Sequence, residues 1–198
     1  MKVEGRRSII TIHPVILAVP EPELGLKGRE KVAVLRRCAR EALARAARFS
    51  SVRLGPLEKD DRGAPRPFNG VHWSLSHKEA YVAAVTAPHA IGIDIEKIKP
   101  VNPALYQRLA DDQEWALAPD ITRVLFFRYW TAKEAVLKAV GLGFAALSHC
   151  RIQAIVDAQR LVLTFKDSNW TVVQYWGTRD HVVAVTADHV DIQWHPID

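Results

Sequence analysis

Asp94 and Glu96 lie two residues apart in the segment IGIDIE at residues 91–96. In an extended strand, side chains at this spacing point to the same face and lie about 7 Å apart. Two carboxylates placed in this way repel each other unless a cation lies between them, and Mg²⁺ typically binds one or two carboxylates together with phosphate oxygens. The pair therefore predicts a magnesium site, with Gly92 leaving room for a ligand. The alternative is an edge strand whose acidic face is solvated.

A second charged pair, Glu134 and Lys138, lies four residues apart in the segment WTAKEAVLK at residues 130–138. On a helix this spacing places both side chains on one face, where an ordinary ion pair contributes only about 0.2–0.5 kcal/mol. That interpretation stays open, but the helix is apolar on nearly every other face, which indicates burial. A buried glutamate needs a cation or a substrate group beside it. We therefore expect Glu134 to be a third metal ligand and Lys138 to contact an anion.

Ser76 and His77 end a short strand-like segment that begins at Trp73. A histidine beside a turn is usually a structural residue, and that alternative stays open. Neither the nucleophile elbow of serine hydrolases nor the HExxH pattern of zinc proteases surrounds this pair, which argues against a catalytic triad and against a zinc site. The functional alternative is a pair that binds phosphate.

Composition limits the classes of protein that fit. The chain has 198 residues, of which 48% are apolar and 25% charged, which is typical of a globular protein. The net charge of +5 suits an anionic ligand or an acidic protein partner, but it is too small and too dispersed to indicate nucleic acid. Two cysteines exclude a disulfide scaffold and favour a reducing, cytoplasmic setting. No run approaches the roughly 20 apolar residues of a membrane span.

These candidate residues need helices and strands that position them. Apolar residues at spacings of three and four predict helices over 31–49, 105–118 and 121–140. Alternation and flanking turn residues predict strands over 73–76, 81–86 and 91–96, followed by an antiparallel meander over 152–156, 161–166, 170–176 and 181–186. The apolar run over 9–17 is interpreted as a strand broken at Pro14 rather than as a signal peptide.

The chain contains one internal similarity. Residues 81–89 and 181–189 share six of nine residue types. Two strands rich in alanine and valine can match by chance, and that explanation stays open at this point. The other explanation is two related halves, residues 1–99 and 100–198, packed about a pseudo-two-fold axis. The similarity stops before the acids, because Asp94 corresponds to Trp194 and Glu96 to Pro196.

Together these motifs resemble a known family. GIDIE at residues 92–96, WTAKEAVLK at 130–138 and SLSH at 74–77 have the order and spacing of the 4′-phosphopantetheinyl transferases, in particular the monomeric type that activates surfactin synthetase. GAPRP at 63–67 is similar to the enterobactin-synthetase type. The family pattern is G-[IV]-D-[IVL]-E, followed later by W/F-[SCT]-x-K-E-[AS]-x-x-K, and each key position is filled here. The resemblance covers residues 36–143.

The resemblance implies an α+β (α/β) fold of two pseudosymmetric halves, each with helices packed on a small antiparallel sheet. Residues 1–99 would carry SLSH and GIDIE, residues 100–198 the WTAKEAVLK helix and the meander, and coenzyme A would bind between them. The implied reaction transfers 4′-phosphopantetheine from coenzyme A to a serine of an apo acyl or peptidyl carrier protein, requires Mg²⁺ and releases adenosine 3′,5′-bisphosphate. The implied partners include neither nucleic acid nor a membrane. We expect a monomer, because one chain holds both halves.

The resemblance also implies roles for individual residues by position. It implies a general base at Glu134, a lysine at Lys138 that stabilises the leaving pyrophosphate group, and a Mg²⁺ site formed by Asp94, Glu96 and Glu134. The implied coenzyme A contacts are Ser76, His77, Arg66, Arg36, Lys133 and Asp94. Many relatives have Gly-Lys-Pro where this chain has Gly63-Ala64-Pro65, so Arg62 or Arg66 must supply that charge.

Two other functions compete with this interpretation. A catalytically silent relative would keep the fold and bind coenzyme A or a carrier protein as a partner module. Such a copy has no physical reason to keep repelling carboxylates together, which argues against it. A Mg²⁺-dependent nucleotide or phosphate hydrolase is the other, but the chain has no phosphate-cradling GxxxxGK[ST] loop. The residues do not indicate whether the carrier belongs to fatty acid, polyketide or nonribosomal peptide biosynthesis.

Overall fold

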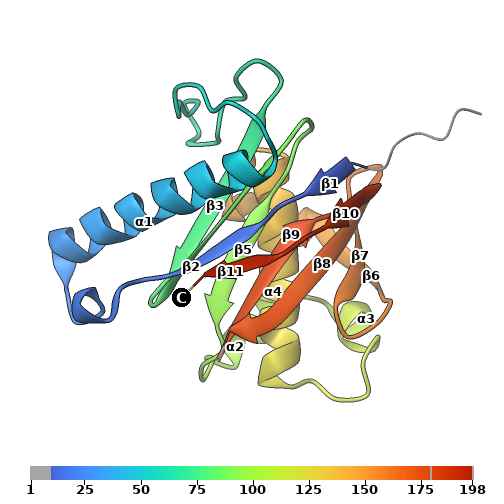
Figure 1. Ribbon diagram of the computed structural model, residues 1–198. Helices are drawn as coiled ribbons and strands as arrows, with labels where there is room; N and C mark the ends of the chain where they lie inside the picture. The colour runs from blue at the N-terminus through green and yellow to red at the C-terminus, as the bar shows by residue number, and fades with distance from the viewer. Residues whose placement is uncertain (1–9, 179, 198) are drawn as a thin grey trace, which may run out of the picture.

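A computed structural model of the chain describes residues 10–178 and 180–197. They form a mixed α+β structure with two main sheets and a small two-stranded one (Figure 1). The first main sheet has four strands in the order β11-β2-β4-β3, with bounds His195–Ile197, Val15–Ala18, Tyr81–Ala87 and His72–Lys78. The second has five strands in the order β5-β9-β8-β7-β6, with bounds Ile93–Lys97, His181–Thr186, Ser168–Thr178, Arg160–Phe165 and Cys150–Ile155.

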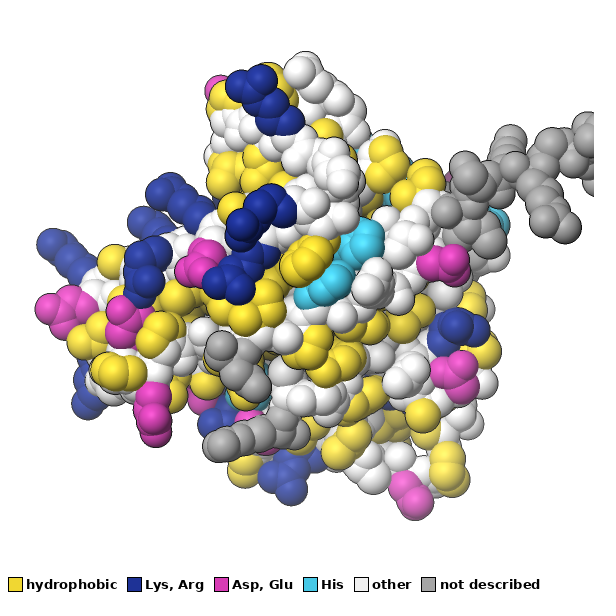
Figure 2. All heavy atoms as spheres, in the orientation of Figure 1, with side chains coloured by type: hydrophobic (Ala, Val, Ile, Leu, Met, Phe, Trp, Pro, Cys, Tyr) yellow, Lys and Arg dark blue, Asp and Glu magenta, His cyan; other side chains and the backbone are white. Residues whose placement is uncertain are grey.

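Helix α1 (Gly28–Phe49) covers the first sheet. Its buried residues recur at spacings of three and four, which places them on one face of the helix. That face packs on strand residues such as Val15, Val82 and Ala84. The opposite face is exposed and carries arginines, and Figure 2 shows basic side chains gathered on this side of the molecule. The predicted helix over 31–49 is confirmed and begins one turn earlier.

Helix α4 (Arg123–Ala139) packs against the second sheet and contacts β9 and β5 most extensively. The sequence predicts burial on nearly every face, and this is confirmed: ten of the helix residues are buried. The antiparallel meander of β6 to β9 is confirmed as well. A third core, built around Ile16, Val85, Ile93 and Val183, joins the two sheets.

The ends of the described chain pair with each other. Strand β1 (Ile10–Ile12) runs parallel to β10 (Val190–Ile192), and β2 runs parallel to β11. Figure 1 shows these C-terminal strands, in red, beside the N-terminal ones, in blue. The break at Pro14 is confirmed, while Ile9 of the predicted run lies outside the described residues. The sequence did not predict β10 or β11.

The predicted helix over 105–118 is wrong as one helix. The structure has two short helices, α2 (Ala104–Leu109) and α3 (Asp112–Trp115), separated by Ala110 in extended conformation. Asp111 begins α3 with a capping box, because its carboxylate accepts from the Glu114 backbone while the Glu114 side chain accepts from the Asp111 backbone. Short 3-10 turns, η1 (Glu21–Glu23) and η2 (Phe144–His149), complete the structure.

Gly92 allows β5 to lie directly against α4. A Cβ at this position would overlap the backbone carbonyl oxygen of Ala135 and lie 2.7 Å from the amide nitrogen of Ala139. The expectation that Gly92 leaves room for a ligand is therefore wrong, because helix backbone fills that space. The close approach brings Asp94, two residues later, within reach of Lys138 on α4.

Gly92→Ala should therefore destabilise the fold. Helix backbone moves less easily than a side chain, so we expect a loss in the free energy of unfolding of about 3 kcal/mol, at the upper end of the cost of overpacking. Urea denaturation measures it. Gly25→Ala is the matched control, since no heavy atom lies within 4 Å of a Cβ there. Equal stability of the two variants would contradict the close packing.

Candidate active site

Asp94 is the centre of the candidate site, and strand alternation places it there. Ile93 and Ile95 point into the core between the sheets, whereas Asp94 points toward α4 and is only 4% exposed. Its Oδ1 accepts a hydrogen bond from Ser76 Oγ at 2.8 Å and one from Lys138 Nζ at 2.7 Å. Its Oδ2 is buried and has no hydrogen-bond partner among the described residues. A buried carboxylate oxygen without a hydrogen-bond partner can accept a hydrogen bond from a donor or bind a cation.

Lys138 is more exposed than the acid with which it pairs. Its side chain is 28% exposed, against 6% for the Asp94 side chain. Besides Asp94, its ammonium donates to the backbone oxygen of Ile93 at 3.2 Å. The ammonium therefore lies at the mouth of the site, where it reaches both the acid and incoming solvent.

Glu96 and Glu134 complete the acid cluster, and the pKa of each is raised. For Glu134 the main cause is burial, followed by the negative charge of Asp94, while Lys138 acts in the opposite direction. For Glu96 the main cause is again burial; its hydrogen bond from Lys78 lowers the pKa and Asp94 raises it. Lys78 Nζ lies 2.6 Å from Glu96 Oε2. The negative charge of Asp94 thus acts on both glutamates.

The cluster does not form a closed metal cage in this arrangement. Within residues 10–178 and 180–197, no three His, Cys, Asp or Glu side chains are grouped closely enough to hold one metal ion. Lys138 and Lys78 each hold one of the acids instead. The donor set nevertheless fits Mg²⁺, because it consists of carboxylate oxygens and includes the unpartnered Asp94 Oδ2.

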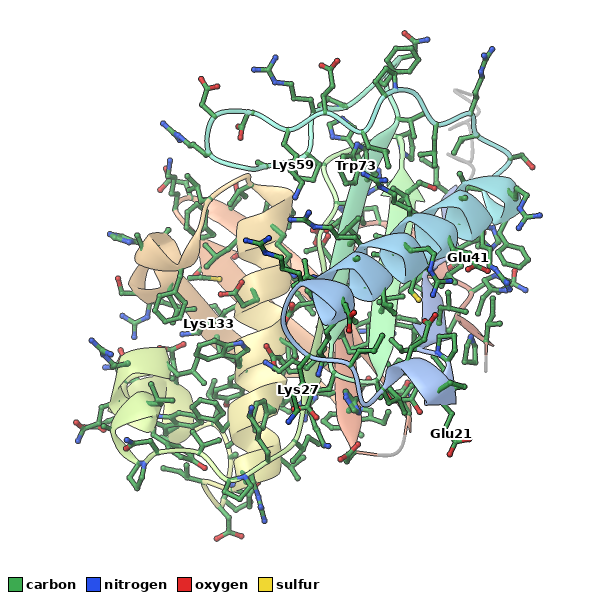
Figure 3. All side chains as sticks on the ribbon, turned by 90° about the vertical axis from the view of Figure 1, so that its left-hand side faces the viewer. Glu21, Lys27, Glu41, Lys59, Trp73 and Lys133 are labelled. Atoms are coloured by element: carbon green, nitrogen blue, oxygen red, sulfur yellow. The ribbon has the colours of Figure 1, made fainter. Side chains whose placement is uncertain are left out.

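Positive charge surrounds His77 at the end of β3. Burial is the main cause that lowers the pKa of His77, and the charges of Lys138, Lys59 and Lys78 lower it further. Three ammonium groups near one neutral imidazole form a rim that suits phosphate oxygens. Lys59 was missed in the sequence because it precedes the GAPRP segment. A β-bridge joins it to Pro65 of that segment, and Figure 3 shows it on the loop above α4.

Arg66 and Arg36 lie outside the two elements that carry the acids, on the loop before β3 and on α1. Arg66 is exposed on the loop, where its backbone oxygen accepts from Trp73 Nε1 at 3.1 Å. Arg36 is exposed on α1. Within the described part of the chain, neither guanidinium makes an ion pair with the acid cluster. Their roles toward coenzyme A stay predictions.

Lys133 is not placed with the cluster, although its neighbour in sequence is Glu134. Its side chain is 1% exposed, and its ammonium lies 2.7 Å from Glu114 Oε1 and 2.6 Å from the backbone oxygen of Leu109. Figure 3 shows it on the side of α4 that faces away from α1. The expected phosphate contact is therefore wrong for this arrangement, because a buried carboxylate already holds the ammonium.

The part of the chain that contains the acids is similar to a known protein family. Residues 90–186 match the model of the 4′-phosphopantetheinyl transferase superfamily. This part of the chain belongs to the 4′-phosphopantetheinyl transferase superfamily. The matched residues include β5, α4 and β9, and hence Asp94, Glu96, Glu134 and Lys138; they do not include Ser76 or His77.

Curated 4′-phosphopantetheinyl transferases show the same similarity over part of their length. Svp of Streptomyces mobaraensis is 33% identical over 144 residues, which cover 64% of this chain and 55% of that protein. Sfp of Bacillus subtilis strain 168 is 32% identical over 126 residues, covering 61% and 56%. Psf-1 of Bacillus pumilus is 34% identical over 95 residues, covering 45% and 41%. The chain spans about half the length of these relatives. None of its described helices is long and apolar enough to cross a bilayer.

Within the matched region, Glu114 fixes the position of α4. Its carboxylate accepts from Lys133, from the amide of Asp111 at 3.1 Å and from the amide of Ile152 at 2.8 Å. Its backbone oxygen accepts from the Tyr129 hydroxyl at 2.9 Å. These bonds tie α4 to α3 and β6, and so set the height at which Glu134 and Lys138 face β5.

Lys133→Met should destabilise the protein by about 3–5 kcal/mol, because it leaves the Glu114 carboxylate buried without a counter-charge. Urea denaturation gives the free energy of unfolding. The double variant Lys133→Met/Glu114→Gln is the control: its amide oxygen can accept from only one of the two backbone amides, since Ile152 donates to Oε1 and Asp111 to Oε2, but no charge stays buried, so part of the stability should return. If the double variant were less stable than the single one, the buried charge would not be the cause.

Proposed function

We propose that this chain transfers the 4′-phosphopantetheine arm of coenzyme A to a serine of an apo acyl or peptidyl carrier protein. The observation that carries the proposal is the buried Asp94, with one oxygen unpartnered, beside Glu96, Glu134 and Lys138 in the region that matches the family. In this reaction the serine oxygen bonds to the phosphorus that bears the pantetheine, the pyrophosphate bond breaks, and adenosine 3′,5′-bisphosphate leaves.

Glu134 is proposed as the base that takes the serine proton. A serine hydroxyl is too weak an acid to ionise near neutral pH, so its proton needs a positioned acceptor at the moment of attack. Burial and the charge of Asp94 raise the pKa of Glu134, which makes its carboxylate a better proton acceptor than an exposed glutamate. The proton ends on a Glu134 oxygen.

Lys138 is proposed to bind the phosphates. Its ammonium is the more exposed partner of its pair with Asp94, so it can turn from that acid to a phosphate oxygen of the substrate. Asp94, Glu96 and Glu134 would hold Mg²⁺, which supplies positive charge to the phosphate oxygens when bound. Ser76 would keep Asp94 oriented through its 2.8 Å hydrogen bond.

We also propose that the chain consists of two related halves, with the boundary before β5 rather than at residue 99, where the sequence pattern placed it. The elements β2-α1-β3-β4 pair with β2 antiparallel to β4 and β4 to β3. The elements β5, α4, β8 and β9 repeat this pairing, with β5 antiparallel to β9 and β9 to β8, although α2, α3, β6 and β7 lie between them in the sequence. The sequence similarity falls on β4 and β9. This correspondence places the second unit's first strand, β5, just before residue 99. A single chain with both units supports a monomer.

Intact-mass analysis tests the activity. The protein is incubated with coenzyme A, Mg²⁺ and apo-carriers of the fatty acid, polyketide and nonribosomal peptide types. A net charge of +5 favours encounter with acidic carriers, so the reaction should slow as salt increases. A gain of one phosphopantetheine on any carrier supports the proposal. No gain, with coenzyme A still bound in calorimetry, would favour a silent binding module.

A further inference from the structure

Two histidines from opposite ends of the described chain meet at the surface. His13 lies between β1 and β2, and His195 begins β11. His13 Nδ1 and His195 Nε2 are 3.1 Å apart. Both side chains are partly exposed, and Figure 2 shows histidine side chains next to each other on this face, bordered by hydrophobic atoms. The transfer chemistry uses neither residue.

The backbone holds the two rings in place. His195 N donates to the Pro14 oxygen at 2.9 Å, and Gln193 N donates to the Ile12 oxygen at 3.0 Å. The Phe49 ring stacks on His195 with centroids 3.8 Å apart and planes within 8°. The facing nitrogens are therefore positioned by strand pairing and by ring stacking, before any ligand arrives. Preorganisation of this kind lowers the cost of binding.

The distance between the nitrogens suits a metal ion. Zn–N bonds of about 2.0–2.1 Å place two nitrogens about 3.3 Å apart in tetrahedral geometry and about 2.9 Å apart at a right angle. We propose that His13 and His195 together bind one divalent transition-metal ion of the Zn²⁺, Ni²⁺ and Cu²⁺ class. With two protein ligands, water supplies the remaining positions, which the partial exposure of both rings permits. Imidazole pairs suit these ions, whereas Mg²⁺ prefers oxygen.

The protonation state of the pair is compatible with binding. Burial, and then the charge of His13, lower the pKa of His195, so its ring is neutral at pH 7. Without metal, one proton lies between the facing nitrogens in an N–H···N bond. When a metal binds, that proton moves to the outer nitrogen of the donating ring, and both facing lone pairs become ligands.

Binding would tie β11 to β2 and so stabilise the native state. An ion that binds only the folded chain raises its stability in proportion to RT ln(1 + [M]/Kd), where [M] is the free metal concentration. The melting temperature should therefore rise with Zn²⁺ concentration. The acid cluster is a separate site, because its ligands are carboxylates on β5 and α4.

Calorimetry with ZnCl₂ on the untagged protein, in excess Mg²⁺ to occupy the acid cluster, tests the proposal. One Zn²⁺ should bind per chain. His13→Gln and His195→Gln should each weaken binding at least about 10-fold, the smallest loss expected when even an outer-shell partner is removed. His72→Gln, which alters another partly buried histidine, should leave binding unchanged.

Two further measurements keep the outcome interpretable. Melting curves without metal report whether each glutamine variant folds, and Phe49→Leu keeps both ligands, so it should retain Zn²⁺ binding. Asp94→Asn should also retain it, which separates this site from the proposed transferase. Absence of Zn²⁺ binding to the unaltered chain, or binding that survives both glutamine substitutions, would overturn the proposal.

Discussion

Asp94→Asn should reduce phosphopantetheine transfer by about 10²–10³-fold or more, the scale of losing a positioned electrostatic group. The amide still accepts from Ser76, so the strand and its neighbours should keep their positions. What disappears is the buried negative charge that faces Lys138 and whose second oxygen is unpartnered. Initial rates of carrier modification at saturating coenzyme A and Mg²⁺ measure the loss.

Stability should change little in this variant. The substitution removes the attraction to Lys138, but it also removes the repulsion that Asp94 exerts on Glu134 and Glu96. As a direct consequence, the pKa of Glu134 should fall, which carboxyl NMR can follow. Asp180→Asn is the matched control, because that carboxylate is half-exposed and pairs with Lys97 instead. Transfer within a few-fold of the unaltered chain would show that Asp94 is structural.

Local patterns predicted the site because its acids lie on regular elements. The alternation in β5 requires that Asp94 and Glu96 leave the core that Ile93 and Ile95 enter, and the structure confirms this. The i,i+4 spacing likewise placed Glu134 and Lys138 on one face of α4. Both patterns depend only on backbone geometry within a few residues.

The predictions that proved wrong concern residues whose surroundings come from segments distant in the sequence. A lysine in a helix is usually solvated, and only the fold shows that Lys133 meets Glu114, which belongs to a short helix whose start at Asp111 was missed. The wrong expectation of ligand space beside Gly92 has the same cause, because the helix backbone that fills this space lies more than forty residues later in the sequence. The three-residue strands β10 and β11 are too short for alternation to reveal, and their partners lie at the other end of the described chain.

Glu134→Gln should separate binding from chemistry. The substitution keeps size and hydrogen bonding but removes charge and basicity, so coenzyme A should still bind while turnover falls by about 10²-fold or more. Lys138→Ala should weaken both, because a phosphate contact acts in the ground state as well as in the transition state. Calorimetric binding of coenzyme A in the presence of Mg²⁺, set beside steady-state rates, distinguishes the two variants. Turnover of Glu134→Gln near that of the unaltered chain would remove Glu134 from the mechanism.

Glu134→Gln should also change how the free energy of unfolding depends on pH. Because the folded state raises the pKa of Glu134 above its ordinary 4.5, the folded chain binds more protons than the unfolded chain between those two values. Stability is therefore lost as pH rises through this window, and the loss persists above it. Glu134→Gln removes that loss, so its stability relative to the unaltered chain should increase from pH 4.5 toward pH 8 in EDTA, which keeps metal from masking the repulsion. A difference independent of pH would mean that Glu134 ionises equally in both states, and then neither burial nor Asp94 prepares it to accept the serine proton.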